Sequence, residues 1–102
     1  MAGFVKVATV SEVPPGQAKL ISAGGMEIAL FNVGGTFYAI ENSCTHVGGP
    51  LSEGMLQESE VECPWHGARF DVKTGKVLAP PAASDVTSYK VRVNGSDIEI
   101  EV

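Results

Sequence analysis

The sequence predicts an all-β protein. Short runs of β-branched and aromatic residues recur along the chain, glycine-containing turns separate them, and no segment shows the apolar i, i+3, i+4 spacing of an amphipathic helix. Residues 10–16 can hold one helical turn before the prolines. We expect strands near Phe4–Val10, Ala18–Ser22, Met26–Asn32, Thr36–Glu41, Glu60–Cys63, Arg69–Asp71, Thr87–Val93 and Asp97–Val102.

Three residue pairs predict tight hairpins between consecutive strands. Gly24-Gly25, Gly34-Gly35 and Asn94-Gly95 can adopt the positive φ angles that two-residue β-turns need. Apolar and polar residues alternate on both sides of the last pair, so each of these strands should have one buried face. The residues expected on the buried faces are Tyr89, Val91 and Val93 before the turn and Ile98, Ile100 and Val102 after it.

The length of 102 residues allows one domain with one modest core. Residues 42–71 differ from the rest, because they contain both cysteines, both histidines and the only tryptophan. Functional residues often lie on loops held by a rigid scaffold. We therefore predict a single domain, 1–102, in which a base made of residues 1–41 and 72–102 carries an inserted loop module at residues 42–71.

Composition and charge argue against several classes of function. The chain carries 12 acidic and 7 basic residues, a net charge of −5, so phosphate backbones and anionic membrane surfaces repel it and a basic protein is a better partner. No apolar run is long enough to cross a bilayer, and the start MAGFVKVATV lacks a signal-peptide pattern. We expect a cytoplasmic monomer that binds neither nucleic acid nor membrane.

Each cysteine of the chain has a histidine close to it. The two segments are Cys44-Thr45-His46 and Cys63-Pro64-Trp65-His66, with sixteen residues between His46 and Cys63. In a cytoplasmic protein, cysteines indicate metal binding or catalysis rather than a disulfide. Two thiolates and two imidazoles suit a tetrahedral Zn²⁺ or a [2Fe-2S] cluster with both histidines on one iron, and the spacing alone does not separate the two. Zinc fingers, however, usually pair Cys with Cys and His with His.

The two segments resemble the cluster-binding loops of the Rieske family. Residues 44–51 read C-T-H-V-G-G-P-L and residues 63–70 read C-P-W-H-G-A-R-F. The following F-x-x-x-T-G-K-V, then Pro80-Pro81 and a closing hairpin, resemble the soluble Rieske ferredoxins of bacterial aromatic-ring dioxygenase systems. The resemblance implies a Rieske fold: an antiparallel β-sandwich or barrel-like base with an inserted two-loop cluster-binding subdomain. It also implies that one iron is bound by Cys44 and Cys63 and the other by His46 and His66.

The resemblance implies an electron carrier and not an enzyme. Such a protein takes electrons from an NAD(P)H-dependent ferredoxin reductase and passes them to a terminal ring-hydroxylating oxygenase of aromatic hydrocarbon catabolism. The four ligands would saturate both irons, and no other His or Cys is available as a base or nucleophile. The alternatives are a Rieske-like small subunit of an NADH-dependent nitrite reductase, which would copurify with a large catalytic subunit, and a zinc-stapled structural module, which would be colourless.

Three residues indicate the reduction potential. Quinol-oxidising Rieske proteins have an extra cysteine in each loop, joined as a disulfide, and a serine whose hydroxyl bonds a cluster sulfide. Gly49, Trp65 and Ala68 stand at those positions. Without that hydrogen bond, the potential should lie near the low end of the Rieske range of roughly −150 to +300 mV.

Several other loop residues have two possible roles. Trp65 can be a core residue or an exposed contact for a partner, and the sequence favours neither. Arg69 and Asp71 can form a local ion pair or remain solvated. In the family the histidine rings lie at the tip of the protein, so partners are expected to dock around Val47, Gly48, Trp65 and Pro81.

Overall fold

A computed structural model describes residues 3–43, 50–65, 67–79 and 84–101 of the chain. These residues form strands almost throughout, with two short 3-10 turns and no α-helix, as the sequence predicted. None of them forms a helix long and apolar enough to span a membrane. The strands are β1 (Phe4–Thr9), β2 (Ala18–Ala23), β3 (Met26–Val33), β4 (Thr36–Glu41), β5 (Met55–Gln57), β6 (Glu60–Glu62), β7 (Arg69–Asp71), β8 (Val77–Ala79), β9 (Ser88–Tyr89), β10 (Val91–Asn94) and β11 (Asp97–Glu101).

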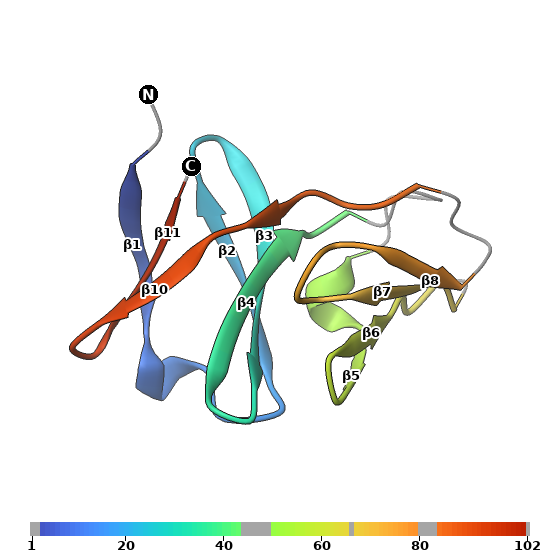
Figure 1. The fold of residues 1–102 in the computed structure, drawn as a ribbon, viewed down its shortest axis with the longest axis horizontal. Coiled ribbons are helices and arrows are strands. Elements are labelled where there is room, and N and C mark those ends of the chain that lie inside the picture. The colour runs from blue at the N-terminus through green and yellow to red at the C-terminus, as the bar shows by residue number, and fades with distance from the viewer. Residues whose placement is uncertain (1–2, 44–49, 66, 80–83, 102) are drawn as a thin grey trace.

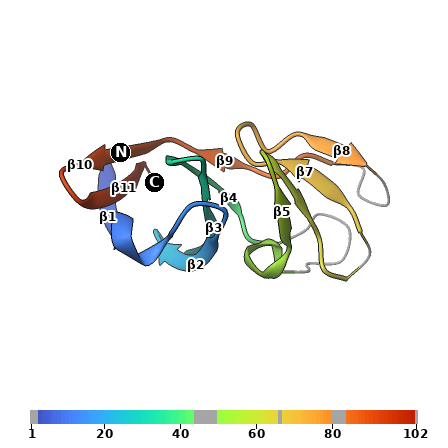
Figure 2. The same ribbon diagram turned by 90° about the horizontal axis from the view of Figure 1, so that it is seen from below.

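The strands form three antiparallel sheets. The first has the order β1-β11-β10, the central sheet has the order β2-β3-β4-β9, and the third has the order β5-β6-β7-β8. Figure 1 shows the third sheet at the opposite end of the molecule from the two termini. Seen from below in Figure 2, the first two sheets curve into a barrel-like base and the third lies beside it. The predicted all-β base is therefore confirmed.

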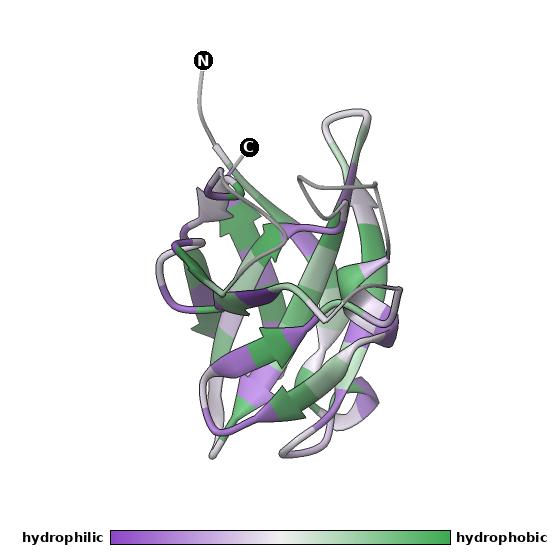
Figure 3. Cartoon of the chain, turned by 90° about the vertical axis from the view of Figure 1, so that its right-hand side faces the viewer, coloured by the Kyte–Doolittle hydropathy of each residue, from purple (hydrophilic) through white to green (hydrophobic). Residues whose placement is uncertain are grey.

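Strand β3, inside the central sheet, is buried on both faces from Ile28 to Asn32. Ile28 and Leu30 of β3 pack into the core shared with the first sheet, whereas Ala29 and Phe31 pack into the core shared with the third. Side chains alternate between the two faces of a strand, so a strand covered on both sides needs a continuous apolar run. Burying each large side chain contributes about 1.5–3 kcal/mol. On several strands in Figure 3, hydrophobic and hydrophilic segments alternate, unlike the continuous apolar run of β3.

Two of the predicted hairpin turns are confirmed, and the third is shifted by one residue. Gly24-Gly25 and Gly34-Gly35 have φ angles of 58° and 78° and of 60° and 97° and join the strands of the central sheet. In the last hairpin Asn94 still pairs with Asp97 in the ladder, so Gly95, at φ 65°, and Ser96 form the turn. The prediction that Asn94 and Gly95 form the turn was wrong, because Asn94 remains in strand β10.

The predicted strand over Thr87–Val93 is in fact two strands in different sheets. β9 pairs with β4 of the central sheet, and β10 pairs with β11 of the first. The chain changes sheet at Lys90, whose carbonyl oxygen accepts a hydrogen bond from the Glu101 N–H at 2.9 Å. Val93 was predicted to be buried but is 48% exposed. It lies on the edge strand β10, which has a neighbour on one side only.

The sequence also failed to predict β5 and β8 and the 3-10 turn at Leu51–Glu53. The sequences of β5 and β8, M-L-Q and V-L-A, lack the polar-apolar-polar alternation that is present in the equally short β6 (E-V-E) and β7 (R-F-D). The other 3-10 turn, Val10–Glu12, lies where one helical turn was expected before the prolines. Its N-terminus is capped by the Glu12 carboxylate, which accepts a hydrogen bond from the Thr9 N–H at 3.0 Å.

The chain leaves the base and returns to it at neighbouring points. β4 pairs with β9 through Ala39–Tyr89 and Ile40–Ser88. Next to this ladder, the Glu41 N–H donates to the Thr87 carbonyl oxygen at 2.9 Å, and the Thr87 N–H donates to the Glu41 carboxylate at 2.7 Å. The segment between Glu41 and Thr87 is therefore held at both ends by the same short ladder.

The turn between β7 and β8 contacts the returning chain at Gly75. Gly75 donates its N–H to the Asp71 carbonyl oxygen at 2.7 Å and accepts from the Val86 N–H at 2.8 Å. Its φ is +80°, and an added Cβ would overlap the Val86 carbonyl oxygen. Only glycine satisfies both conditions, so Gly75 joins the third sheet to the base.

Replacing Gly75 by alanine should lower the thermal unfolding midpoint by at least about 5 °C. The positive φ costs an L-residue about 1–2 kcal/mol, and the overlap with Val86 adds to that cost. Circular dichroism during heating measures the midpoint. Gly3→Ala is the control, because an added Cβ there meets no atom within 4 Å. Equal midpoints for the two variants would contradict this role of Gly75.

Candidate functional site

The second cysteine segment forms a tight turn between β6 and β7. Cys63 follows β6 directly, is 1% exposed and carries a free thiol. Its N–H donates to the Ala68 carbonyl oxygen at 2.7 Å, and its carbonyl oxygen accepts from the Gly67 N–H at 3.1 Å. Gly67 has a φ of +77°, which allows the chain to reverse within these few residues. The two hydrogen bonds close the turn where it leaves the sheet.

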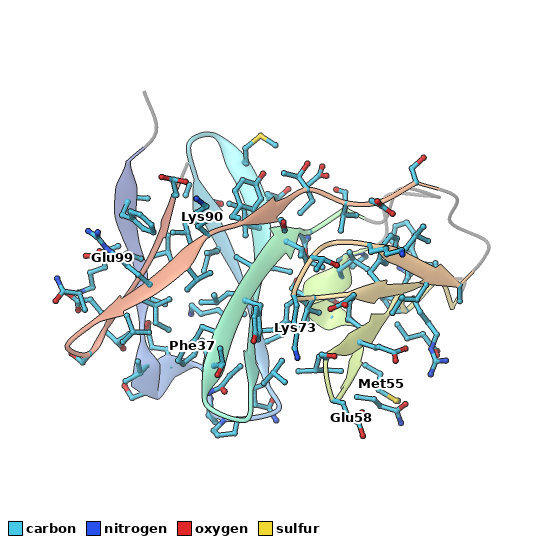
Figure 4. The ribbon with its side chains drawn as sticks, in the orientation of Figure 1. Phe37, Met55, Glu58, Lys73, Lys90 and Glu99 are labelled. Carbon is cyan, nitrogen blue, oxygen red and sulfur yellow. The ribbon has the colours of Figure 1, made fainter. Side chains whose placement is uncertain are left out.

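The exposed side of this turn carries a large aromatic residue. Trp65 is 58% exposed, which identifies it as a surface residue and rejects the alternative that it belongs to the core. Met55 on β5 is a second exposed apolar residue of the third sheet (Figure 4). A single exposed apolar side chain needs no explanation, but a tryptophan beside an expected ligand is a candidate contact for a partner.

Arg69 and Asp71 do not form the local ion pair that was one of their two possible arrangements. Arg69 Nε lies 3.9 Å from Glu62 Oε1 across the β6–β7 ladder, and about half of each side chain is exposed. Asp71 Oδ1 instead accepts a hydrogen bond from the Lys73 N–H at 2.8 Å. Exposed ion pairs of this kind contribute little to stability.

The first cysteine segment is closed at its base by Asn42. The Asn42 carbonyl oxygen accepts from the Leu51 N–H at 2.7 Å, and its side-chain Oδ1 accepts from the Ser52 N–H at 2.9 Å. Ser43 and Pro50 form a β-bridge one step further along. Sequence analysis missed Asn42, since a lone asparagine after a strand has no periodic signal. Its position two residues before Cys44 was the available indication.

Each cysteine segment is closed by hydrogen bonds at its base, and residues of both closures pack in the same hydrophobic core. The buried residues of this core that belong to the two closures and the third sheet are Leu51, Val61, Cys63, Ala68 and Phe70, and they pack with Ala29, Phe31 and Ile40 of the central sheet. Residues from both segments are therefore anchored in one rigid core.

Of the four expected ligands, the structure describes Cys63 alone. Cys44, His46 and His66 lie outside the described residues, as do Val47, Gly48, Gly49, Pro80 and Pro81. Within the described part of the chain, no group of three or more His, Cys, Asp or Glu residues could hold a metal ion. The described part of the expected site is compatible with an iron-sulfur cluster, because Cys63 offers a buried thiol at the start of a closed turn.

A shallow groove between the base and the third sheet has a different chemistry. Its lining includes Phe37, Lys73 and Lys90, which are labelled in Figure 4. The Lys73 ammonium lies 6.0 Å from the centre of the Tyr38 ring. Burial raises the pKa of Tyr89 above its usual value, and the charge of Glu41 adds to that shift. Among the described residues, no Cys or His lines this groove.

Comparisons with known proteins identify the family of the chain. The Rieske [2Fe-2S] domain family matches residues 3–90. The chain is 50% identical over 94 residues to the 3-phenylpropionate/cinnamic acid dioxygenase ferredoxin subunit of Shigella boydii serotype 4 (strain Sb227), which covers 91% of this chain and 88% of the relative. The corresponding subunit of Escherichia coli (strain K12) is 49% identical with the same coverage.

A solved structure shows the same fold over nearly the whole chain. The ferredoxin of carbazole 1,9a-dioxygenase from Nocardioides aromaticivorans IC177 superimposes with a TM-score of 0.91 at 38% identity, covering 95% of both chains. The chain therefore belongs to the Rieske [2Fe-2S] domain family, and its cofactor is a [2Fe-2S] cluster rather than a zinc ion.

Proposed function

We propose that this protein is a one-electron carrier that takes electrons from an NAD(P)H-dependent ferredoxin reductase and passes them to a terminal ring-hydroxylating oxygenase. The observation that carries the proposal is the nearly full-length similarity to ferredoxin subunits of aromatic dioxygenases, which leaves no segment for a catalytic domain in the aligned part of the chain. A related ferredoxin, 34% identical with a TM-score of 0.89 over 95% of this chain and 91% of that one, occurs in a complex of reduced oxygenase and oxidised ferredoxin in carbazole 1,9a-dioxygenase.

The proposed cluster ligands are Cys44 and Cys63 on one iron and His46 and His66 on the other. When bound, the cluster accepts and releases one electron. Two thiolates balance the positive charge of the oxidised core, and neutral imidazoles add none, so this ligand set favours reduction more than four thiolates would. The buried position of Cys63 supports its role, because it keeps water away from the thiolate.

We also propose that the protein works in the cytoplasm as a monomer. Its net charge of −5 supports solubility and contact with basic protein surfaces. The division into a base, 1–41 and 72–102, and a cluster-binding subdomain, 42–71, stays a prediction. The separate third sheet supports an inserted module beside the base, but its last strand, Val77–Ala79, lies beyond the proposed boundary at residue 71.

The proposed docking surface is centred on Trp65. Transient redox interfaces are small, and an exposed aromatic residue provides much contact area with few ordered bonds. Its neighbour Pro64 is also exposed. Because electron transfer weakens steeply with distance, a partner that contacts the residue beside a ligand is well placed to exchange electrons.

Ligand variants test the assignment of the cluster. The purified protein should contain two irons and two sulfides per chain. Cys63→Ser should lose the visible absorption, because an alkoxide poorly replaces a soft thiolate. The double variant His46→Ala/His66→Ala should lose the Rieske electron paramagnetic resonance (EPR) signal, whereas Met55→Ala, at an exposed residue, should keep it. A wild-type EPR signal in the histidine double variant would show that other residues bind the second iron.

Ala68→Ser tests the hydrogen bonding around the cluster. Ala68 is fully buried in the closed turn, and a hydroxyl added there that reaches a sulfide would withdraw electron density and raise the reduction potential. Redox titration monitored by circular dichroism measures the change. Ala39→Ser is the matched control, because Ala39 is also buried but faces the other core. An unchanged or lower potential in Ala68→Ser would refute this explanation.

Trp65→Asp tests the docking surface. It should slow electron transfer to the oxygenase by about tenfold or more, a typical loss for an interface hot spot, and leave the optical spectrum nearly unchanged. Val93→Asp is the matched control, because Val93 is about equally exposed but lies on β10 in the base. Stopped-flow kinetics measures both rates. If Trp65→Asp and Val47→Asp both transfer electrons at the wild-type rate, the partner docks elsewhere.

A further inference from the structure

We propose that Asn42 is a positioning residue for the cluster: its buried side chain fixes the segment that carries the first cysteine and histidine, and so determines how firmly the cluster is held. This inference rests on the ligand assignment proposed above. Asn42 has no donor group soft enough to bind iron, so any effect it has on the cluster is indirect.

Asn42 joins the central sheet to the segment that returns from the first loop. Its N–H donates to the carbonyl oxygen of Glu27 on β3 at 3.2 Å, which continues the β3–β4 ladder by one residue. Its own carbonyl oxygen and Oδ1 accept from the N–H groups of Leu51 and Ser52. One residue therefore connects a rigid strand to both of the first two residues of the 3-10 turn Leu51–Glu53.

Asn42 Oδ1 provides the Ser52 N–H with a hydrogen-bond acceptor that the 3-10 turn itself lacks. The first N–H groups of any helical turn lack an acceptor within that turn. Leu51 is bonded by the Asn42 backbone, and Ser52 by the Asn42 side chain. Asn42 is 7% exposed, so water is a poor substitute acceptor there. Without Oδ1, the 3-10 turn has one fewer attachment to the sheet.

The hydrogen bonds of Asn42 affect the expected ligands because these ligands lie on the adjoining stretch of chain. Cys44 and His46 lie between Ser43 and Pro50, which form a β-bridge immediately beyond Asn42. In the part of the second cysteine segment that the structure describes, the closing hydrogen bonds are backbone bonds, through Cys63, Gly67 and Ala68. In the first closure a side chain contributes one of the bonds, so there the closure can be weakened by a substitution that leaves the backbone intact.

The chain contains a matched control for this role. Asn32 is also buried, and its side chain also makes hydrogen bonds to the backbone. Its Nδ2 donates to the Val13 carbonyl oxygen, and its Oδ1 accepts from the Gly35 N–H, both at 2.7 Å. These contacts hold turns of the base. Replacing Asn32 should therefore affect folding stability without affecting the cluster.

The experiment compares Asn42→Ala, Asn42→Asp and Asn32→Ala in the cluster-containing protein. Loss of the visible absorption in the presence of an iron chelator gives the half-life of the cluster. EPR line widths report the uniformity of the ligand geometry, and the thermal midpoint reports the fold. Asn42→Ala should shorten the half-life by about threefold or more, the size of effect expected from the loss of one buried hydrogen bond, and should broaden the EPR lines.

The two other variants separate positioning from stability. Asn42→Asp keeps an oxygen that can accept from Ser52, so its half-life and line widths should stay close to those of the wild type. Asn32→Ala should lower the thermal midpoint and leave the EPR lines unchanged. A wild-type half-life and spectrum in Asn42→Ala, with a lowered midpoint, would make Asn42 a purely structural residue and overturn the proposal.

Two further outcomes are decisive. If Asn42→Ala does not fold, Asn42→Ser provides the test, because its side chain is polar but too short to accept the same bond. Asn42→Ser should then show a shortened half-life and broadened lines, and wild-type values would overturn the proposal. A wild-type protein without a [2Fe-2S] spectrum would overturn the proposed function and this inference together, whereas unaffected variants of a cluster-containing protein would overturn the inference alone.

Discussion

The burial of both faces of strand β3 determines the arrangement of the rest of the molecule. The side chains of β3 alternate between two cores, one shared with the first sheet and one with the third. Because a strand of this kind is stable only when both faces are covered, the third sheet completes the fold as well as carrying a cysteine. Loss of the third sheet would expose Ala29, Phe31 and Ile40 to water.

The same core gives the redox site its rigidity. Leu51, Cys63 and Ala68 belong to the two loop closures and are also fully buried core residues. Side chains packed at the density of a protein interior change position little. An electron carrier benefits from such a support, because small structural change between the oxidised and reduced states lowers the barrier to transfer. Stability and function thus depend on the same contacts.

The sequence predicted the features that repeat or that depend on chemistry. Strand periodicity and glycine pairs gave most of the base, and the Cys-His pairs indicated the cluster. Short elements without a period, such as β5 and β8, were not detected. The change of sheet at Lys90 was missed because apolar and polar residues continue to alternate through Lys90. Only the pairing partner changes there, from β4 to β11. Asn42 was missed because its partners, Leu51 and Ser52, are brought to it only by the tertiary fold.

The adjacent departure and return of the chain at Glu41 and Thr87 has an evolutionary consequence. Because the base closes its own ladder between β4 and β9, changes in the length of the segment between them cost little additional loop entropy and need not disturb the base. Insertions and deletions in the loops of this segment can be accommodated while the scaffold is retained, as long as the third sheet still covers Ala29, Phe31 and Ile40. Lineages of this domain could therefore diverge in partner choice through that segment alone, with the barrel-like base inherited almost unchanged.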